Sequence, residues 1–289
     1  MRSALGIGEE HSSLSKSPSQ FVDLTSLCCQ AAGGHPEWAD DLTVVWLFFY
    51  TAAHIMDKVQ DKDEPEPWWR DLGPGGALSA ATGFYFSASL ALSQLSSNPH
   101  THVAAKEIVS DLYNSFLVMT SGQFAEMIDS QPSLEDYWKY AEAKSGAFFA
   151  LACRSGAKLA TSDKSVLDGF HRFGHHLGML VQLKDDLDDI RPPSEGAVAG
   201  QRLEISRSLP VIFAQNVLPD ADRERLRVSL SEAPWDAQAA GEVIRLLDQS
   251  NAAVYLVAEM ERHRQMAMDA IHQAVPPSTS REALEYYLK

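Results

Sequence analysis

Residues Val166–Ile190 read VLDGFHRFGHHLGMLVQLKDDLDDI, and this stretch decides the class of fold. Its apolar residues recur at steps of three and four, the pattern of an amphipathic helix, and its last turns are crowded with aspartates. The same period runs through Asp41–Val59, Val103–Ile128, Leu134–Ala160 and Ala240–Ile271. No stretch alternates with period two for long enough to predict a strand. The sequence therefore predicts an all-α fold, with residues 1–18 as a flexible tail and 19–289 as one large helical bundle.

The composition of the chain disfavours several classes of binding partner. With 24 Lys and Arg against 39 Asp and Glu, the formal net charge of the 289 residues is −15, which disfavours nucleic acid or an anionic membrane as partner. The most apolar stretch, Leu42 to Met56, is shorter than a membrane span and indicates a buried helix. The cysteines Cys28, Cys29 and Cys153 form no CxxC pair and suit a reducing cytoplasm.

Two acidic clusters stand at helical spacing. Asp57 and Asp61 are four residues apart at the polar end of an apolar helix, and Gln182, Asp185, Asp186 and Asp189 are expected to group on one face of another. Carboxylates held together repel one another, and Mg²⁺ removes that cost while binding substrate phosphates. Spacing alone fits a magnesium site and a pair of solvated acidic helix ends equally well.

An ordered set of motifs resembles a known family. GHHLGMLVQLKDDLDDI is similar to the second aspartate-rich motif of the trans-isoprenyl diphosphate synthases, and TAAHIMDKVQDKDE stands where their first DDxxD motif would be. Gly122-Gln123 with Glu126, Lys144-Ser145-Gly146, and Arg207-Ser208-Leu209-Pro210 resemble the family's GQ, KT and KxTLP segments in the same order. The likeness covers about residues 20 to 230.

The resemblance implies a helical bundle around a central cavity, with three Mg²⁺ ions holding the diphosphate of an allylic prenyl substrate. It implies metal binding by Asp57, Asp61, Asp185, Asp186 and Asp189, and diphosphate binding by Arg70, Lys144, Gln182, Lys58 and Arg207. Asp57, Asp61, Asp185 and Lys144 would form the catalytic set. The same likeness implies a homodimer, and the short apolar stretch predicts no stable membrane insertion.

The departures from the family pattern concern the second substrate, isopentenyl diphosphate. Tyr50 replaces a His or Gln, Asp71 takes the place of an arginine, and the GGKxxRP motif is missing, so these losses all fall on that one binding site. Separately, Lys58 replaces the middle aspartate of the first motif, which leaves the pair Asp57 and Asp61 intact. These departures favour ionisation of a C15 or C20 prenyl diphosphate followed by cyclisation, as in a terpene synthase. Three alternatives remain: chain elongation, transfer to an indole or a peptide tryptophan, and a non-catalytic partner subunit.

Aromatic residues at helical spacing predict the cavity wall. Trp46, Tyr50, Ala53 and Asp57 follow one face of the first motif's helix, with the small Ala53 just below the expected metal site. Phe49, Phe84 and Phe149 are further candidates for the wall. Simple core packing is the more common reason for an aromatic residue at such a position.

Overall fold

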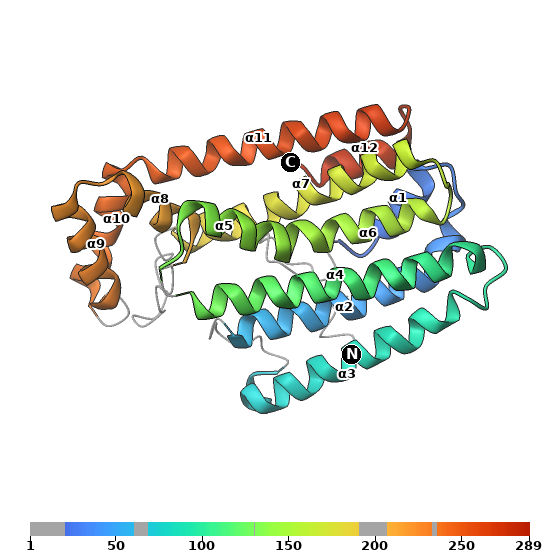
Figure 1. The fold of residues 1–289 in the computed structure, drawn as a ribbon, viewed down its shortest axis with the longest axis horizontal. Coiled ribbons are helices and arrows are strands. Elements are labelled where there is room, and N and C mark those ends of the chain that lie inside the picture. The colour runs from blue at the N-terminus through green and yellow to red at the C-terminus, as the bar shows by residue number, and fades with distance from the viewer. Residues whose placement is uncertain (1–20, 61–68, 130, 191–206, 233–235) are drawn as a thin grey trace.

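The computed structural model describes residues 21–60, 69–129, 131–190, 207–232 and 236–289, and within these ranges it contains helices and no strand (Figure 1). The all-α prediction is therefore confirmed. The tail expected at residues 1–18 lies outside the described residues.

The elements follow one another as short and long helices. The first half contains α1 (Leu24–Ala31), η3 (Pro36–Ala39), α2 (Asp40–Gln60), η4 (Arg70–Leu72), α3 (Gly73–Gln94) and α4 (His102–Ile128). The middle contains α5 (Leu134–Ala141), the π-helical turn η5 (Glu142–Gly146), α6 (Ala147–Lys158) and α7 (Lys164–Asp189). The last part contains α8 (Leu209–Val217), α9 (Asp220–Glu232), α10 (Ala237–Gln249), α11 (Ala252–Ala274) and α12 (Thr279–Tyr286).

Local side-chain chemistry fixes where several of these helices begin. The Asp163 side chain accepts hydrogen bonds from the backbone N–H groups of Ser165 and Val166, which caps α7. Ser133 and Asp136 form a reciprocal capping box at the start of α5. These caps satisfy N–H groups that would otherwise lack a partner at a helix end.

Helix α7 is central to the bundle and packs against both α6 and α11 (Figure 1). Two glycines allow this close approach. A Cβ atom at Gly174 would lie 2.4 Å from the Phe149 carbonyl oxygen, and one at Gly178 would lie 2.1 Å from that of Ser145. Because no side chain fits there, the middle of α7 is held directly against η5 and the start of α6.

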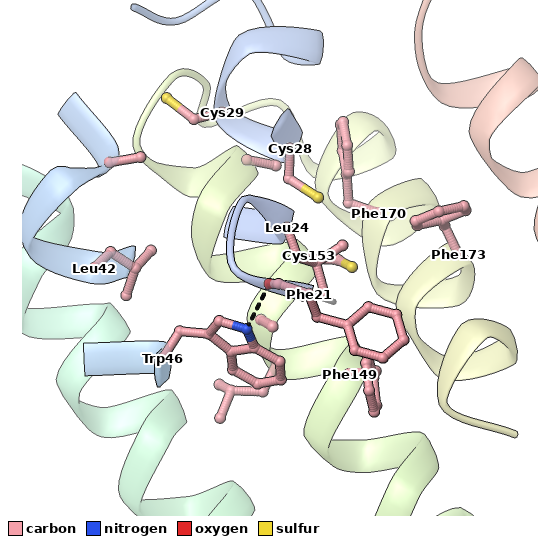
Figure 2. Close-up of a cluster of buried hydrophobic side chains, with 14 of the residues drawn as sticks. Phe21, Leu24, Cys28, Cys29, Leu42, Trp46, Phe149, Cys153, Phe170 and Phe173 are labelled. Carbon is pink, nitrogen blue, oxygen red and sulfur yellow. Dashed lines mark hydrogen bonds between the residues drawn. The ribbon is translucent and has the colours of Figure 1, made fainter. Parts of the chain in front are cut away.

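The main hydrophobic core joins α1, α2, α6 and α7. Figure 2 shows Phe21, Trp46 and Phe149 packed together in it, with the Trp46 indole N–H donating to the Phe21 carbonyl oxygen at 3.1 Å. A separate apolar cluster holds α8, α9 and α10 together at one end of the molecule.

Among the described residues, Pro36–Gln60 is the one helical segment long and apolar enough to cross a membrane. Within the protein, 44% of its apolar window is buried. It contains α2, whose Val45, Trp46 and Phe49 belong to the main core, so it has the burial expected of a core helix.

Candidate active site

A cavity of about 650 Å³ lies within the helical bundle. Its lining comes from α2, α3, α4, η5, α6 and α7, so segments more than a hundred residues apart in the chain share one space. The walls are largely apolar and aromatic, and polar side chains are present at Asp57, Lys58, Lys144, Gln182 and Asp185.

One carboxylate from each acidic segment lines this cavity. Asp57 from α2 and Asp185 from α7 both line it, as the sequence analysis expected of opposed carboxylates. The Asp57 side chain is 49% exposed and so remains accessible to a ligand. Two carboxylates on separate helices, facing one cavity, form a donor set for a hard cation that carries part of its own ligand shell.

Lys144 is held between two of the acidic side chains. Its Nζ lies 2.6 Å from Glu126 Oε2 and 3.4 Å from Asp57 Oδ1. The π-helical turn η5 carries both Lys144 and Ser145 into the lining of the cavity, and such turns are frequent at functional sites. The sequence places Glu126 within a motif but indicates no role for it in the site.

Gln182 is linked to both of its neighbours in the site. The Ser145 hydroxyl donates to Gln182 Oε1 at 2.9 Å, and Gln182 Nε2 donates to Asp186 Oδ1 at 3.3 Å. These contacts join η5 to the acidic end of α7.

Asp186 faces away from the cavity, although the sequence analysis placed it with the metal ligands. It is 4% exposed, and its Oδ2 accepts hydrogen bonds from the Tyr137 hydroxyl and from the Leu209 backbone N–H, both at 2.7 Å. Successive residues of a helix point about 100° apart, so Asp185 faces the cavity while Asp186 faces α5 and α8. Burial beside this carboxylate raises the pKa of Tyr137 well above its usual value.

The donor set fits a metal ion that arrives with a phosphate group. Within the described ranges, no group of three or more His, Cys, Asp or Glu side chains is arranged to hold a metal by itself. Mg²⁺ is usually bound through one or two carboxylates plus substrate phosphates and water. Asp57 and Asp185 meet that requirement.

Comparison with known proteins shows to which family the chain belongs. The profile described as "Polyprenyl synthetase" matches residues 19–247. The chain belongs to the polyprenyl synthetase family. The resemblance read from the motifs is thereby confirmed.

Two curated relatives show how far the likeness extends. The chain is 30% identical over 225 residues to a geranylgeranyl diphosphate synthase of Mycobacterium tuberculosis, covering 74% of this chain and 62% of that protein. It is 26% identical over 279 residues to a (2E,6E)-farnesyl diphosphate synthase of Mycobacterium bovis, covering 92% of this chain and 77% of the relative.

Solved structures share the fold. A geranylgeranyl pyrophosphate synthetase from Pyrococcus horikoshii is similar with a TM-score of 0.79 at 20% identity, over 93% of this chain and 83% of the other. A polyprenyl synthetase from Streptomyces coelicolor gives 0.75 at 22% identity, over 92% and 82%.

Several residues expected at the site of this family member lie elsewhere. Arg70 is exposed in η4 and is not among the residues that line the cavity. Arg207 is also exposed, but its guanidinium donates to the carbonyl oxygen of Met127, a lining residue, at 3.1 Å. Asp61 and the side chain of Asp189 lie outside what the structure describes.

The predicted wall divides into three groups. Phe49, Tyr50, Ala53 and Phe149 line the cavity. Trp46 lies deeper in the core, with its ring 4.4 Å from that of Phe148. Phe84 packs beside Phe48, at 5.9 Å between ring centroids, and near the separate cluster around Ile55, because the neighbouring Tyr85 faces the cavity instead.

Phe116 is a wall residue that the sequence analysis missed. Its ring lies 4.2 Å from that of Phe49, and together with Phe148 these rings separate the large cavity from a small void of about 10 Å³. The periodicity of α4 marks Phe116 as apolar, but no feature of the sequence indicates which partner helix it faces.

Proposed function

We propose that this protein is a magnesium-dependent prenyltransferase that ionises an allylic prenyl diphosphate in the cavity and transfers the prenyl chain to an acceptor. The observation that carries the proposal is the shared cavity of Asp57, Asp185 and Lys144. The curated relatives named above are chain-elongating synthases, which favours transfer over the cyclisation that the sequence analysis placed first.

Each part of the cavity has a task in this proposal. Asp57 and Asp185 would hold Mg²⁺, and Lys144 and Gln182 would bind the diphosphate oxygens beside them. When bound, Mg²⁺ would neutralise the leaving diphosphate as the C–O bond of the substrate breaks. The apolar walls bind the prenyl chain and exclude water from the allylic cation, while nearby aromatic rings favour positive charge.

In the transfer step, the C1 atom of the allylic cation forms a carbon–carbon bond with the double bond of isopentenyl diphosphate. Loss of a proton then restores a double bond, and the product is a longer prenyl diphosphate. The substrate we propose is a C15 or C20 allylic diphosphate, since the cavity has a volume of about 650 Å³ and its walls are largely apolar.

Cyclisation is the second candidate, and two departures from the family's sequence pattern favour it. Tyr50 lines the cavity where the family pattern has a His or Gln, and Asp71 puts a negative charge where the pattern has an arginine. A carboxylate beside a diphosphate is repulsive, which weakens binding of the second substrate.

One assay separates the two candidates. The purified protein is incubated with Mg²⁺ and geranyl, farnesyl or geranylgeranyl diphosphate, with and without isopentenyl diphosphate, and both hydrocarbons and diphosphates are analysed. A longer diphosphate formed only with isopentenyl diphosphate supports elongation, and hydrocarbon formed without it overturns elongation in favour of cyclisation. Absence of turnover with every substrate contradicts both.

Two substitutions test the site itself. Asp57→Asn and Asp185→Asn should each lower turnover at least about a hundredfold, because each removes a charged metal ligand. Asp168→Asn is the matched control, since Asp168 lies on α7 but is exposed and paired with Arg154. Unchanged turnover in the first two variants would contradict the proposed metal roles.

The length of the product tests the floor of the cavity. Phe116→Ala should lengthen the prenyl product, because it opens the large cavity toward the void beneath it. Phe84→Ala is the control and should leave product length unchanged, since Phe84 packs outside the cavity lining. The measurement is chromatography of the dephosphorylated products, and equal lengths in wild type and Phe116→Ala would show that the floor lies elsewhere.

We also propose that the protein is a homodimer that acts in the cytoplasm. Support for the dimer comes from α3 and from α4 between Ile108 and Ile128, whose exposed residues are uncharged. Support for the compartment comes from the three cysteines, which are free and buried.

A further inference from the structure

We propose that Lys58 supplies the charge of one metal ion, so that this site binds a diphosphate with one fewer magnesium ion than an unbroken DDxxD motif would need. The inference rests on the proposed function and assigns a distinct role to one residue of that site. The chain reads Asp57-Lys58-Val59-Gln60-Asp61, with lysine at the middle acidic position of the pattern.

The position of Lys58 gives it access to the ligand. It lies in the last turn of α2, next in sequence to Asp57, and both residues line the cavity. Its side chain is partly exposed, as expected of a flexible ammonium group at a cavity rim.

The charges in the described lining are balanced. Two carboxylates, Asp57 and Asp185, face two ammonium groups, Lys58 and Lys144. Lys144 is already flanked by Glu126 and Asp57 within hydrogen-bond or ion-pair distance. The lysine at position 58 therefore decides whether the described lining is neutral or carries a net negative charge.

The charge of Lys58 sets how many Mg²⁺ ions it can replace. Replacing aspartate by lysine changes the local charge by two positive units, which equals the charge of one Mg²⁺ ion. A tethered ammonium group attracts the diphosphate whatever the free metal concentration, whereas a bound ion must be recruited from solution. Binding that recruits fewer ions depends less steeply on the concentration of magnesium.

Calorimetric binding of inorganic pyrophosphate and of farnesyl S-thiolodiphosphate, which ionises poorly, tests this without measuring turnover. Wild type, Lys58→Asp, Lys58→Ala and Lys58→Arg are titrated in EDTA and over a series of Mg²⁺ concentrations. The slope of log affinity against log [Mg²⁺] should rise by about one from wild type to Lys58→Asp. Affinity in EDTA should fall about tenfold in Lys58→Ala, and Lys58→Arg should retain it.

Lys106→Asp is the matched control, because it makes the same charge change at an exposed position of α4 outside the cavity lining. It should keep the wild-type slope. An equal slope in wild type and Lys58→Asp, or an equal change in Lys106→Asp, overturns the proposal. Release of diphosphate from farnesyl diphosphate by wild type is measured in parallel, so failure of the Lys58 proposal is distinguished from failure of the proposed function.

Discussion

At the scale of single residues, the neighbours Asp185 and Asp186 show how one motif divides its tasks. Asp185 lines the cavity, whereas Asp186 is buried and joins α7 to α5 and to the start of α8 through Tyr137 and Leu209. A buried carboxylate is stable only when its oxygens are hydrogen-bonded. We therefore infer that Asp186 holds the end of α7 in place and so orients Asp185.

Tyr137→Phe tests that role. The change removes the hydroxyl that donates to Asp186 Oδ2 at 2.7 Å. We expect the free energy of unfolding to fall by about 1–3 kcal/mol, because a buried charged acceptor loses a donor. Urea denaturation measures it, with Tyr286→Phe as control because Tyr286 is 70% exposed. Equal losses in the two variants would contradict the role of the contact.

A buried histidine pair predicts the response to acid. His176 on α7 and His263 on α11 face each other with their Nδ1 atoms 3.0 Å apart. Burial lowers the pKa of His176 to about 4 and that of His263 to about 3, and His175, Arg262 and Arg172 add positive charge nearby. Trp138 stacks on His263 at 5.9 Å.

These lowered pKa values make the folded protein less stable in acid. The pKa of each histidine is near 6.5 in the unfolded chain and lower in the folded protein, at about 4 for His176. Between these two pH values the unfolded chain binds more protons than the folded protein does. The contribution of the pair to stability is therefore fully present above pH 6.5 and is lost as the pH falls toward 4. His176→Gln should reduce this loss of stability between pH 6.5 and 5. Urea denaturation at several pH values measures it, with the exposed His102→Gln as control. An unchanged pH profile in His176→Gln would contradict the assignment.

At the scale of elements, the contact of α7 with η5 positions the site. Both elements carry site residues, and Gly178 permits their close approach because a Cβ atom there would lie 2.1 Å from the Ser145 carbonyl oxygen. Apolar periodicity predicts both helical segments. It does not predict the π-helical turn, because the extra residue in that turn depends on what packs against it.

Gly178→Ala should force α7 and η5 apart. We expect a loss of about 1–3 kcal/mol in the free energy of unfolding from overpacking, together with weaker pyrophosphate binding as Lys144 moves. The control is Gly241→Ala in α10, where an added Cβ meets nothing within 4 Å. A helix-interior Gly→Ala change there should be neutral or stabilising by up to about 1 kcal/mol. A stable Gly178→Ala variant would show that the helices have room to adjust.

At the scale of the whole molecule, the outer sides of α3 and of the later part of α4 are unusual because they carry no exposed charge. Helix α3 contains no charged residue, and the exposed residues of α4 from Ile108 to Ile128 are also uncharged. The large apolar side chains exposed on these two faces are Leu78, Phe86, Leu90, Tyr113, Leu117, Val118, Phe124, Met127 and Ile128. These nine side chains are each between 38% and 72% exposed, which is more than the scattered single apolar residues usual on the surface of a monomer.

Charge favours a second copy of the same chain as the occupant. Two molecules of net charge −15 repel one another over most of their surfaces, and an uncharged face is where that repulsion is smallest. Tyr113, Phe124 and Met127 belong both to this face and to the cavity lining, so a partner seated there would cover the side of the cavity.

Leu117→Glu tests the dimer. The wild type should sediment as a dimer at micromolar concentration, and the variant as a monomer, because a carboxylate would be buried in an apolar interface. Val254→Glu is the control, since Val254 is an equally exposed apolar residue (66%, against 68% for Leu117) on α11. A monomeric wild type, or a variant that stays dimeric, would contradict the proposed interface.

The sequence alone determined the helical class, the family, and the two acidic segments that reach the cavity as Asp57 and Asp185. These features depend on local spacing: apolar periodicity defines a helix, and the order of motifs identifies the family. The tertiary structure decided which side of each helix faces the cavity, and so separated Asp185 from Asp186, placed Phe84 outside and brought in Phe116 and Glu126. That choice depends on how neighbouring helices pack, and packing joins residues far apart in the chain whose contacts no local pattern records.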